Sequence, residues 1–261
     1  MTYLDRILAA HRQGAAADAD SLDLAALEAR AHQTAPTRGF RRALREAAQQ
    51  QGLAVIAEVK RRSPSKGDLA IDLDPALLAT QYASGGAAGL SVLTDQMFFG
   101  GSPGDLQAAR AAVGLPVLRK DFTVSLADVF DARCMGADCL LLIVAALSED
   151  ELRRFHAAAV GVGLDVLVEI HDENELDRAM AVGATLVGVN QRDLVTFEVD
   201  TERAVRMAEL IPEGVVKVAE SGITGRPDAL VLRDAGYQAV LVGESLVRSA
   251  DPAVAVADLL P

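Results

Sequence analysis

A carboxylate and an ammonium follow the first strongly apolar run of the sequence. The run covers residues 54–57 and is typical of a buried strand, and Glu58 and Lys60 come directly after it. Because side chains two apart in a strand point to the same side, both groups are expected to face one space at the strand's end. Removing such charges from water is costly. The pair therefore indicates either a structural ion pair or groups that exchange protons with a ligand.

Lysine is scarce in this chain, although the sequence has 25 basic residues. The four lysines are Lys60, Lys66, Lys120 and Lys217. A lysine can tune its pKa and release a proton, whereas arginine keeps its charge. Lys120 ends a short apolar segment, and desolvation there is expected to lower its pKa toward neutrality, while Glu169 and Glu58 are expected to act in the opposite direction and hold the proton on at rest. A lowered pKa would suit a general acid.

Other polar side chains stand at the ends of further apolar runs. They are Thr94, Glu169, Asn190, Arg192 and Glu220. If these runs are parallel strands of one barrel, their carboxyl ends meet on a single face, where such enzymes bind substrate. Positioned acids and bases on that face indicate proton-transfer chemistry. Taken singly, Asn190 could be a capping residue and Glu220 a buried partner of Lys60 or Lys217.

Small residues follow the last two apolar runs. The segments are 220–223, Glu-Ser-Gly-Ile, and 243–245, Gly-Glu-Ser. Backbone N–H groups can approach an anion at such turns, helped by a following helix N-terminus. This pattern favours a phosphate site at the place usual for barrels; the alternative is two tight turns. An apolar wall could come from Phe99, Phe122, Leu141, Ile143 and Leu194.

Eight short apolar segments alternate with amphipathic, alanine-rich ones. The expected strands are 54–57, 90–93, 117–118, 139–144, 166–170, 186–190, 215–219 and 239–242. This alternation predicts parallel βαβ units, and eight strands close a (β/α)₈ barrel. A doubly wound open sheet is the alternative, but no GxGxxG follows the first strand. Residues 1–50 show three helical patterns, so we expect a single domain over 1–261 with an N-terminal helical extension.

Composition limits the classes of partner. The net charge of −12 opposes binding to nucleic acid and to anionic membranes, and aromatic residues make up only 4%. No apolar run approaches the roughly 20 residues that span a bilayer. Cys134 and Cys139 form neither a zinc pattern nor a disulfide framework, so both are expected to be buried thiols in a reducing cytoplasm. His156 and His171 lack the spacing of metal ligands. His171 follows a strand and could bind a ligand, but it is interpreted as a polar surface residue.

The motifs, taken in order, closely resemble one enzyme family. They are IAEVKRRSPSKG, LSVLTDQMFFGGS, LPVLRKDF, LLIVAAL, VLVEIHDENEL, VGVNQRDLVTFEVD, VAESGI and LVGESLV. From about Phe40 onward, the chain resembles indole-3-glycerol-phosphate synthase of tryptophan biosynthesis. The resemblance implies a (β/α)₈ barrel, with no metal or organic cofactor, that acts on a small phosphorylated substrate. It also implies a monomer or a homodimer.

The implied reaction converts 1-(2-carboxyphenylamino)-1-deoxyribulose 5-phosphate to indole-3-glycerol phosphate, carbon dioxide and water. The resemblance makes Lys120 the general acid at the ribulose carbonyl and Glu169 its acid–base partner. Glu58 and Lys60 resemble the pair that acts in ring closure and dehydration. Asn190 is similar to the residue that orients the sugar.

The resemblance also extends to substrate binding. Ser63 and Arg192 resemble the groups around the substrate carboxylate, and Glu220 is similar to the acid that completes the catalytic set. The phosphate site is implied at Ser221, Gly222, Gly243 and Glu244, mostly through backbone N–H groups. Some members carry serine where this chain has Glu244.

Two other functions fit parts of the pattern. One is another phosphosugar-binding barrel enzyme, such as phosphoribosylanthranilate isomerase, which would not explain Glu58, Lys60 and Lys120 together. The other is a non-catalytic barrel subunit, which loss of a catalytic residue would favour, and none is lost here. The loop 61–69, with its proline and glycine, is expected to act as a lid over the first strand.

Overall fold

Eight parallel strands close into a barrel in the structure, a computed structural model that describes residues 2–19, 21–64, 66–193 and 195–261. The strands are β1 (Ala54–Val59), β4 (Gly89–Leu93), β5 (Val117–Lys120), β6 (Cys139–Ile143), β7 (Asp165–Ile170), β8 (Leu186–Asn190), β9 (Val216–Glu220) and β10 (Ala239–Val242). Their order around the barrel follows the sequence, and β10 pairs with β1 to close it. The expected barrel is confirmed, and the open-sheet alternative is wrong.

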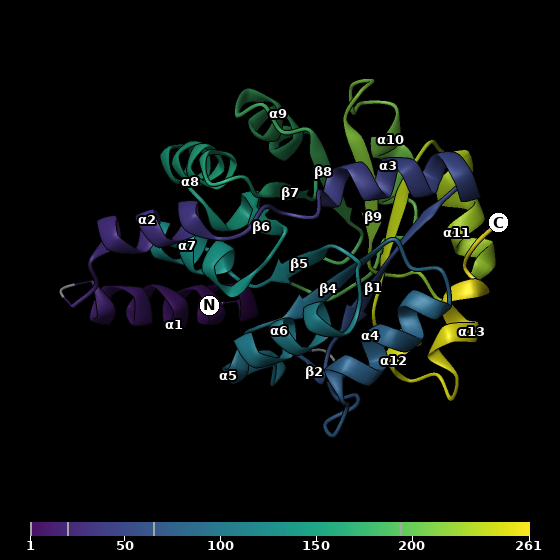
Figure 1. Cartoon of the computed structure of the whole chain (residues 1–261). Coiled ribbons are helices and arrows are strands. Elements are labelled where there is room, and N and C mark those ends of the chain that lie inside the picture. The colour runs from purple at the N-terminus through teal and green to yellow at the C-terminus, as the bar shows by residue number, and fades with distance from the viewer. Residues whose placement is uncertain (1, 20, 65, 194) are drawn as a thin grey trace.

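Helices cover the outside of the barrel (Figure 1). The outer helices are α4 (Pro75–Ser84), α6 (Pro103–Ala112), α7 (Leu126–Met135), α8 (Glu149–Gly161), α9 (Glu173–Ala181), α10 (Arg203–Ala208), α11 (Arg226–Asp234) and α13 (Pro252–Ala257). Three short helical turns, α5 (Gln96–Phe99), η1 (Val144–Ala146) and α12 (Glu244–Val247), follow strands at one end. Most helices begin at a capping side chain; at α7, for example, the Ser125 hydroxyl accepts the Asp128 N–H.

Side chains alternate between the two faces of the strands, and this alternation places the site. Along β1, Val55, Ala57 and Val59 pack under the helices in one hydrophobic core. Ala54 and Ile56 point instead into a second core inside the barrel. The next residue on the inner face is Glu58, so its carboxylate stands at the top of the barrel interior. The same rule applies to Lys120, because Leu118 belongs to the inner core.

Three N-terminal helices precede the barrel. They are α1 (Tyr3–Asp18), α2 (Leu24–Gln33) and α3 (Phe40–Gln51). Phe40 and Leu44 of α3 are fully buried in the inner core, so α3 closes the end of the barrel at which the strands begin. Gly89, at the start of β4, leaves room for the Phe40 ring, since a Cβ there would lie 3.0 Å from it.

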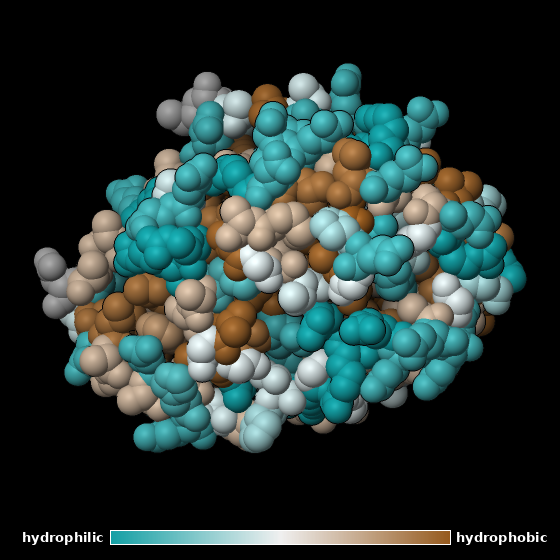
Figure 2. All heavy atoms as spheres, turned by 90° about the horizontal axis from the view of Figure 1, so that it is seen from above, coloured by the Kyte–Doolittle hydropathy of each residue, from teal (hydrophilic) through white to brown (hydrophobic). Residues whose placement is uncertain are grey.

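The surface seen from above shows hydrophilic side chains over much of its area, with smaller apolar areas between them (Figure 2). Among the described residues, no helix combines the length and apolar character needed to cross a membrane. Cys139 is buried as expected, whereas Cys134 is only partly buried.

Candidate active site

A cavity of about 740 Å³ opens at the carboxyl ends of the strands. Its lining includes most of the site residues expected from the sequence: Glu58, Lys60, Ser63, Phe99, Lys120, Phe122, Leu141, Ile143, Glu169, Asn190, Arg192, Glu220, Ser221, Gly222, Gly243 and Glu244. Thr94, which was expected on the same face, does not line the cavity; it is buried, donates its hydroxyl to Asp121 and accepts from Arg119. Leu194 lies outside the described residues. The convergence predicted for residues far apart in sequence is therefore observed.

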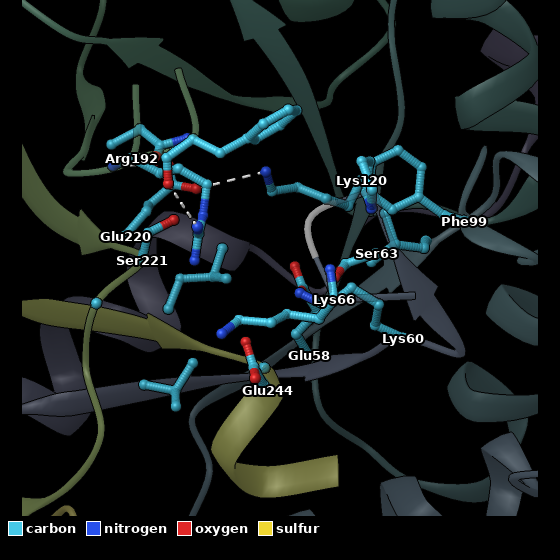
Figure 3. Close-up of a pocket in the computed structure, with 18 of the residues that line it drawn as sticks. Glu58, Lys60, Ser63, Lys66, Phe99, Lys120, Arg192, Glu220, Ser221 and Glu244 are labelled. Atoms are coloured by element: carbon cyan, nitrogen blue, oxygen red, sulfur yellow. Dashed lines mark hydrogen bonds and ion pairs between the residues drawn. The ribbon is translucent and has the colours of Figure 1, made fainter. Parts of the chain in front are cut away.

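The Lys120 ammonium lies close to two buried glutamates, and Figure 3 shows its side chain pointing toward one of them, Glu220. Its Nζ is 3.2 Å from Glu169 Oε2 and 3.5 Å from Glu220 Oε2. Arg119 and Asp121 point the other way and pair with each other at 3.0 Å, as strand alternation requires. Burial lowers the pKa of Lys120, but Glu169, Glu220 and Glu58 outweigh it and leave that pKa raised. Desolvation lowers this pKa as expected, but the opposing effect expected of Glu169 and Glu58, to which Glu220 adds, is the larger one, so a net lowering is wrong.

Glu220 differs from the neighbouring carboxylates. Burial and the nearby charges of Glu169 and Glu58 raise the pKa of Glu220 to about 8, against the opposing effect of Lys120. Its Oε1 has no hydrogen-bond partner among the described residues. Gly188 in β8 makes the space for this oxygen, because a Cβ at that position would overlap it. Glu220 therefore binds a proton more readily than an ordinary carboxylate, beside a charged lysine.

The Glu58–Lys60 pair forms a second charged group on the other side of the cavity. Lys60 Nζ lies 2.6 Å from Glu58 Oε1, and the Ser91 hydroxyl donates to Glu58 Oε2 at 3.3 Å. Burial raises the pKa of Glu58, but Lys60 and Lys120 outweigh it and leave that pKa lowered. Gly243, directly after β10, leaves space for this pair, because a Cβ there would overlap the Glu58 carboxylate in its present position.

Asn190 connects Glu169 to the loop after β8. Its Nδ2 donates to Glu169 Oε1 at 3.1 Å, and its Oδ1 accepts the Arg192 N–H at 3.0 Å. The Arg192 guanidinium in turn donates to the Phe197 carbonyl at 3.0 Å. Asn190 thus holds Oε1 of the Glu169 carboxylate, while Lys120 contacts the other oxygen, Oε2.

The turn after β9 has an unusual backbone. Ser221 and Gly222 have φ values of 67° and 72°, and Ser221 is one of only two non-glycine residues with positive φ among the described residues. Gln191 Nε2 donates to the Ser221 carbonyl at 2.7 Å and holds the turn in place. The helix after this turn, α11, begins only at Arg226, and α12 after β10 is four residues long. After β10, Gly243 is the N-cap of α12 and Glu244 its first residue, so their backbone N–H groups lie at a helix N-terminus, whereas those of Ser221 and Gly222 lie in a loop.

Comparisons with known proteins give the family. A sequence model described as "Indole-3-glycerol phosphate synthase" matches residues 4–259. The indole-3-glycerol phosphate synthase of a Nocardioides species is 53% identical, over 98% of this chain and 97% of its own length. That of Mycolicibacterium gilvum is 50% identical, over 99% of this chain and 94% of its own.

This chain belongs to the indole-3-glycerol phosphate synthase family. Among solved structures, a thiamine phosphate pyrophosphorylase from Pyrococcus furiosus has a TM-score of 0.61 at 14% identity, covering 81% of this chain and 95% of its own. An N-acetylmannosamine-6-phosphate 2-epimerase from Clostridium perfringens has a TM-score of 0.60 at 13% identity, covering 76% and 89%. These distant likenesses support the barrel fold alone. The family resemblance seen in the motifs is confirmed.

The sequence did not indicate that helix α1 contributes to the cavity of this synthase-family barrel. Tyr3, Leu4 and Ile7 line the cavity, and the Tyr3 ring meets the Phe197 ring edge-on at 5.4 Å. His11 Nε2 lies 2.8 Å from Asp95 Oδ2 and ties the helix to the loop after β4. The apolar face of α1 was a visible signal, but its spacing could not indicate which end of the barrel it would cover.

The aromatic wall is built as expected, with α1 added to it. The rings of Phe99 and Phe122 lie 6.3 Å apart, and the His11 ring lies 5.5 Å from Phe122. Both phenylalanines could have been ordinary packing residues if considered singly. Together they give the cavity an aromatic side, with the two phenylalanine rings tilted by 37° to each other.

The loop after β1 covers one side of the cavity. It contains a small hairpin of β2 (Arg62–Ser63) and β3 (Gly67–Asp68). Arg61 anchors its base through two bonds to Asp105, at 3.0 and 2.9 Å, and through two backbone carbonyls. Ser63 and Lys66 line the cavity from this loop. A fixed base with a short hairpin above it is compatible with the expected lid.

One group of side chains has the spacing of a metal site among the described residues: His11, Asp95 and Asp121. The carboxylate oxygens of the two aspartates already accept hydrogen bonds. Asp95 Oδ1 accepts two backbone N–H groups after β4, and Asp121 accepts from Arg119 and Thr94. The contacts explain the cluster as the attachment of α1 to the barrel.

His171 was interpreted as a surface residue, and this interpretation is wrong. The imidazole is only 13% exposed, and its Nε2 lies 3.8 Å from Glu169 Oε1. The signal was its position: His171 comes directly after the strand that carries Glu169. Because strand alternation fixes side-chain direction only within the strand, the orientation of the next residue could not be read from the pattern.

Proposed function

We propose that this chain closes the indole ring of indole-3-glycerol phosphate, using Lys120 as proton donor. The observation that supports this most is the placement of the Lys120 ammonium between Glu169 and Glu220, in a cavity that also holds the Glu58–Lys60 pair. The substrate is 1-(2-carboxyphenylamino)-1-deoxyribulose 5-phosphate. Its aryl ring suits the Phe99–Phe122 wall. Its two anionic groups suit the cationic side chains that line the cavity, which include Lys60, Lys66, Arg192 and Arg248.

Ring closure requires a proton at the ribulose carbonyl oxygen. As the aryl carbon that bears the carboxylate bonds to the carbonyl carbon, the C=O electron pair becomes an alkoxide. Lys120 is fully charged at rest because its pKa is raised, and it gives its proton to that oxygen as the alkoxide forms. The Glu169 carboxylate stabilises the positive charge that develops on the ring system. The aryl carbon–carboxylate bond then breaks, carbon dioxide leaves, and its electron pair restores the aromatic ring.

Dehydration completes the pyrrole ring. The new hydroxyl leaves as water after accepting a proton, and a proton is lost from the neighbouring carbon. The Glu58–Lys60 pair places an ammonium, which can give a proton, 2.6 Å from a carboxylate, which can take one. Glu220, with a pKa of about 8, is a neutral acid at pH 7 and can return the proton that Lys120 has given. Asn190 holds Glu169 in place throughout.

Binding of the two anions divides the cavity. Ser63 and Arg192 are assigned to the substrate carboxylate. The phosphate is assigned to the backbone N–H groups of Ser221, Gly222 and Gly243, and at the two glycines no side chain stands in the way of close approach. At Glu244 only the backbone N–H is expected to take part, so its carboxylate need not face the phosphate.

The whole chain is expected to act as one catalytic domain, since α1 lines the same cavity as the barrel loops. We further propose that it works without a metal or organic cofactor, as a monomer or a homodimer in the cytoplasm. The two free cysteines are compatible with a reducing compartment.

Turnover of two substrates tests the function. The purified protein should convert the carboxyphenylamino substrate to indole-3-glycerol phosphate, followed by the absorbance of the indole ring. It should leave phosphoribosylanthranilate unchanged. Turnover of phosphoribosylanthranilate alone would favour the isomerase alternative, and binding without turnover of either would favour a non-catalytic barrel.

A further inference from the structure

His171 is held by one carboxylate and aimed at another. Glu175 Oε2 accepts the His171 backbone N–H at 2.7 Å and lies 3.0 Å from the ring atom Nδ1. Because a carboxylate only accepts hydrogen bonds, Nδ1 must carry a proton in this arrangement. The contact therefore fixes both the orientation of the imidazole and the protonation of one of its nitrogens.

The other ring nitrogen points toward the proposed catalytic carboxylate. His171 Nε2 is buried and lies 3.8 Å from Glu169 Oε1, and no hydrogen bond reaches it from the described residues. Glu169 itself is 1% exposed and already accepts from Lys120 and Asn190. A buried polar nitrogen without a partner is costly, and a shift of a few tenths of an ångström would bring it toward a hydrogen bond with Glu169.

The surrounding charges favour the protonated ring. Glu169 on β7 and Glu175 on α9 face the imidazole, and Arg203 on α10 is the opposing cation. Burial lowers the pKa of His171, but the two carboxylates outweigh it and leave that pKa raised. Burial likewise raises the pKa of Glu169, while Lys120 and then His171 lower it, and the net direction is down.

We propose that His171 is a positioning residue that acts through Glu169. Its imidazolium, held by Glu175, keeps the Glu169 carboxylate ionised and oriented when Lys120 turns from Glu169 to the substrate carbonyl. Without it, the departure of the Lys120 charge would leave a buried carboxylate supported only by Asn190. His171 does not line the cavity, so its effect should fall on the chemical step and not on substrate binding. This inference rests on the proposed function for the role of Glu169.

The kinetic test compares His171→Gln with His156→Gln. Glutamine keeps an N–H donor but carries no charge, and His156 lies partly buried on α8, away from the cavity. We expect kcat of His171→Gln to fall about 10-fold with KM changed less than about 2-fold, while His156→Gln stays like the parent. In His171→Gln, the acid limb of the kcat–pH profile should move to higher pH by about one unit or more, because loss of a neighbouring cation raises the pKa of Glu169.

A second measurement needs no turnover and so separates this inference from the proposed function. The pKa of His171 is followed by NMR of its ring protons in the free protein, with His171→Gln giving the assignment. Glu169→Gln and Glu175→Gln should each lower that pKa, by about one unit or more. The inference would be overturned if Glu169→Gln left the pKa of His171 unchanged. It would also be overturned if the acid limb of the kcat–pH profile did not move in His171→Gln. Failure of the parent to form product, with the NMR coupling intact, would count only against the proposed function.

Discussion

Lys120 Nζ lies 3.2 Å from Glu169 Oε2, and this pair brings together strands β5 and β7, which do not pair with each other. The two residues are 49 positions apart in sequence. The contact forms because both side chains point into the barrel, where the carboxyl ends of alternate strands meet. An ammonium and a carboxylate are thereby held together at the carboxyl ends of the strands.

Gly188→Ala tests the space that Glu220 occupies. The added methyl would overlap Glu220 Oε1, so the carboxylate must move away from Lys120 or the strand must shift. We expect kcat to fall at least about 10-fold and stability to drop by about 1–3 kcal/mol, as for overpacked cores. Gly161→Ala is the matched control, because nothing lies within 4 Å of a Cβ there. Normal activity in Gly188→Ala would mean that the position of Glu220 is unimportant.

Gly222→Ala tests the backbone turn assigned to the phosphate. A Cβ at Gly222 would lie 2.6 Å from Val199 Cγ1, and φ there is 72°. The turn should shift, and KM should rise by about 10-fold or more, because close approach of N–H groups to the phosphate is lost. Gly214→Ala controls for backbone strain, since φ is 90° but nothing lies within 4 Å. If both variants show the same small change in KM, the assignment of this turn is wrong.

Glu220 should make stability depend on pH. Its pKa is raised from 4.5 to about 8 in the folded state, so between these values the folded protein binds more protons than the unfolded chain. Stability from this group is fully present below the lower value and is lost as pH rises through the higher one. Glu220→Gln cannot ionise, so its Tm should fall less than that of the parent between about pH 5 and pH 9. Parallel Tm curves for the two proteins would show that Glu220 is already charged at neutral pH.

Much of the site could be predicted because strand alternation and parallel pairing are simple rules. They are sufficient to bring Glu58, Lys120 and Glu220 to one end of a barrel. The pKa of Lys120 could not be predicted in the same way, since its direction depends on how many carboxylates face it. The contribution of α1 was also missed, because the direction in which an amphipathic helix crosses a barrel depends on loop contacts such as His11–Asp95. The orientation of His171 toward Glu169 was missed for a similar reason, because the alternation of side-chain directions does not hold for a residue just after a strand.

The most direct test of the account is the activity of Lys120→Met beside Lys120→Arg. Methionine keeps most of the stem and removes the proton, so the variant should fold, bind indole-3-glycerol phosphate and lose at least about 10²-fold in kcat. Arginine keeps the positive charge beside Glu169 but cannot release a proton near neutral pH, so it should restore little. Single-turnover formation of the indole ring measures the step itself. Recovery of most of the parent rate in Lys120→Arg would contradict the account, because Lys120 would then supply charge alone.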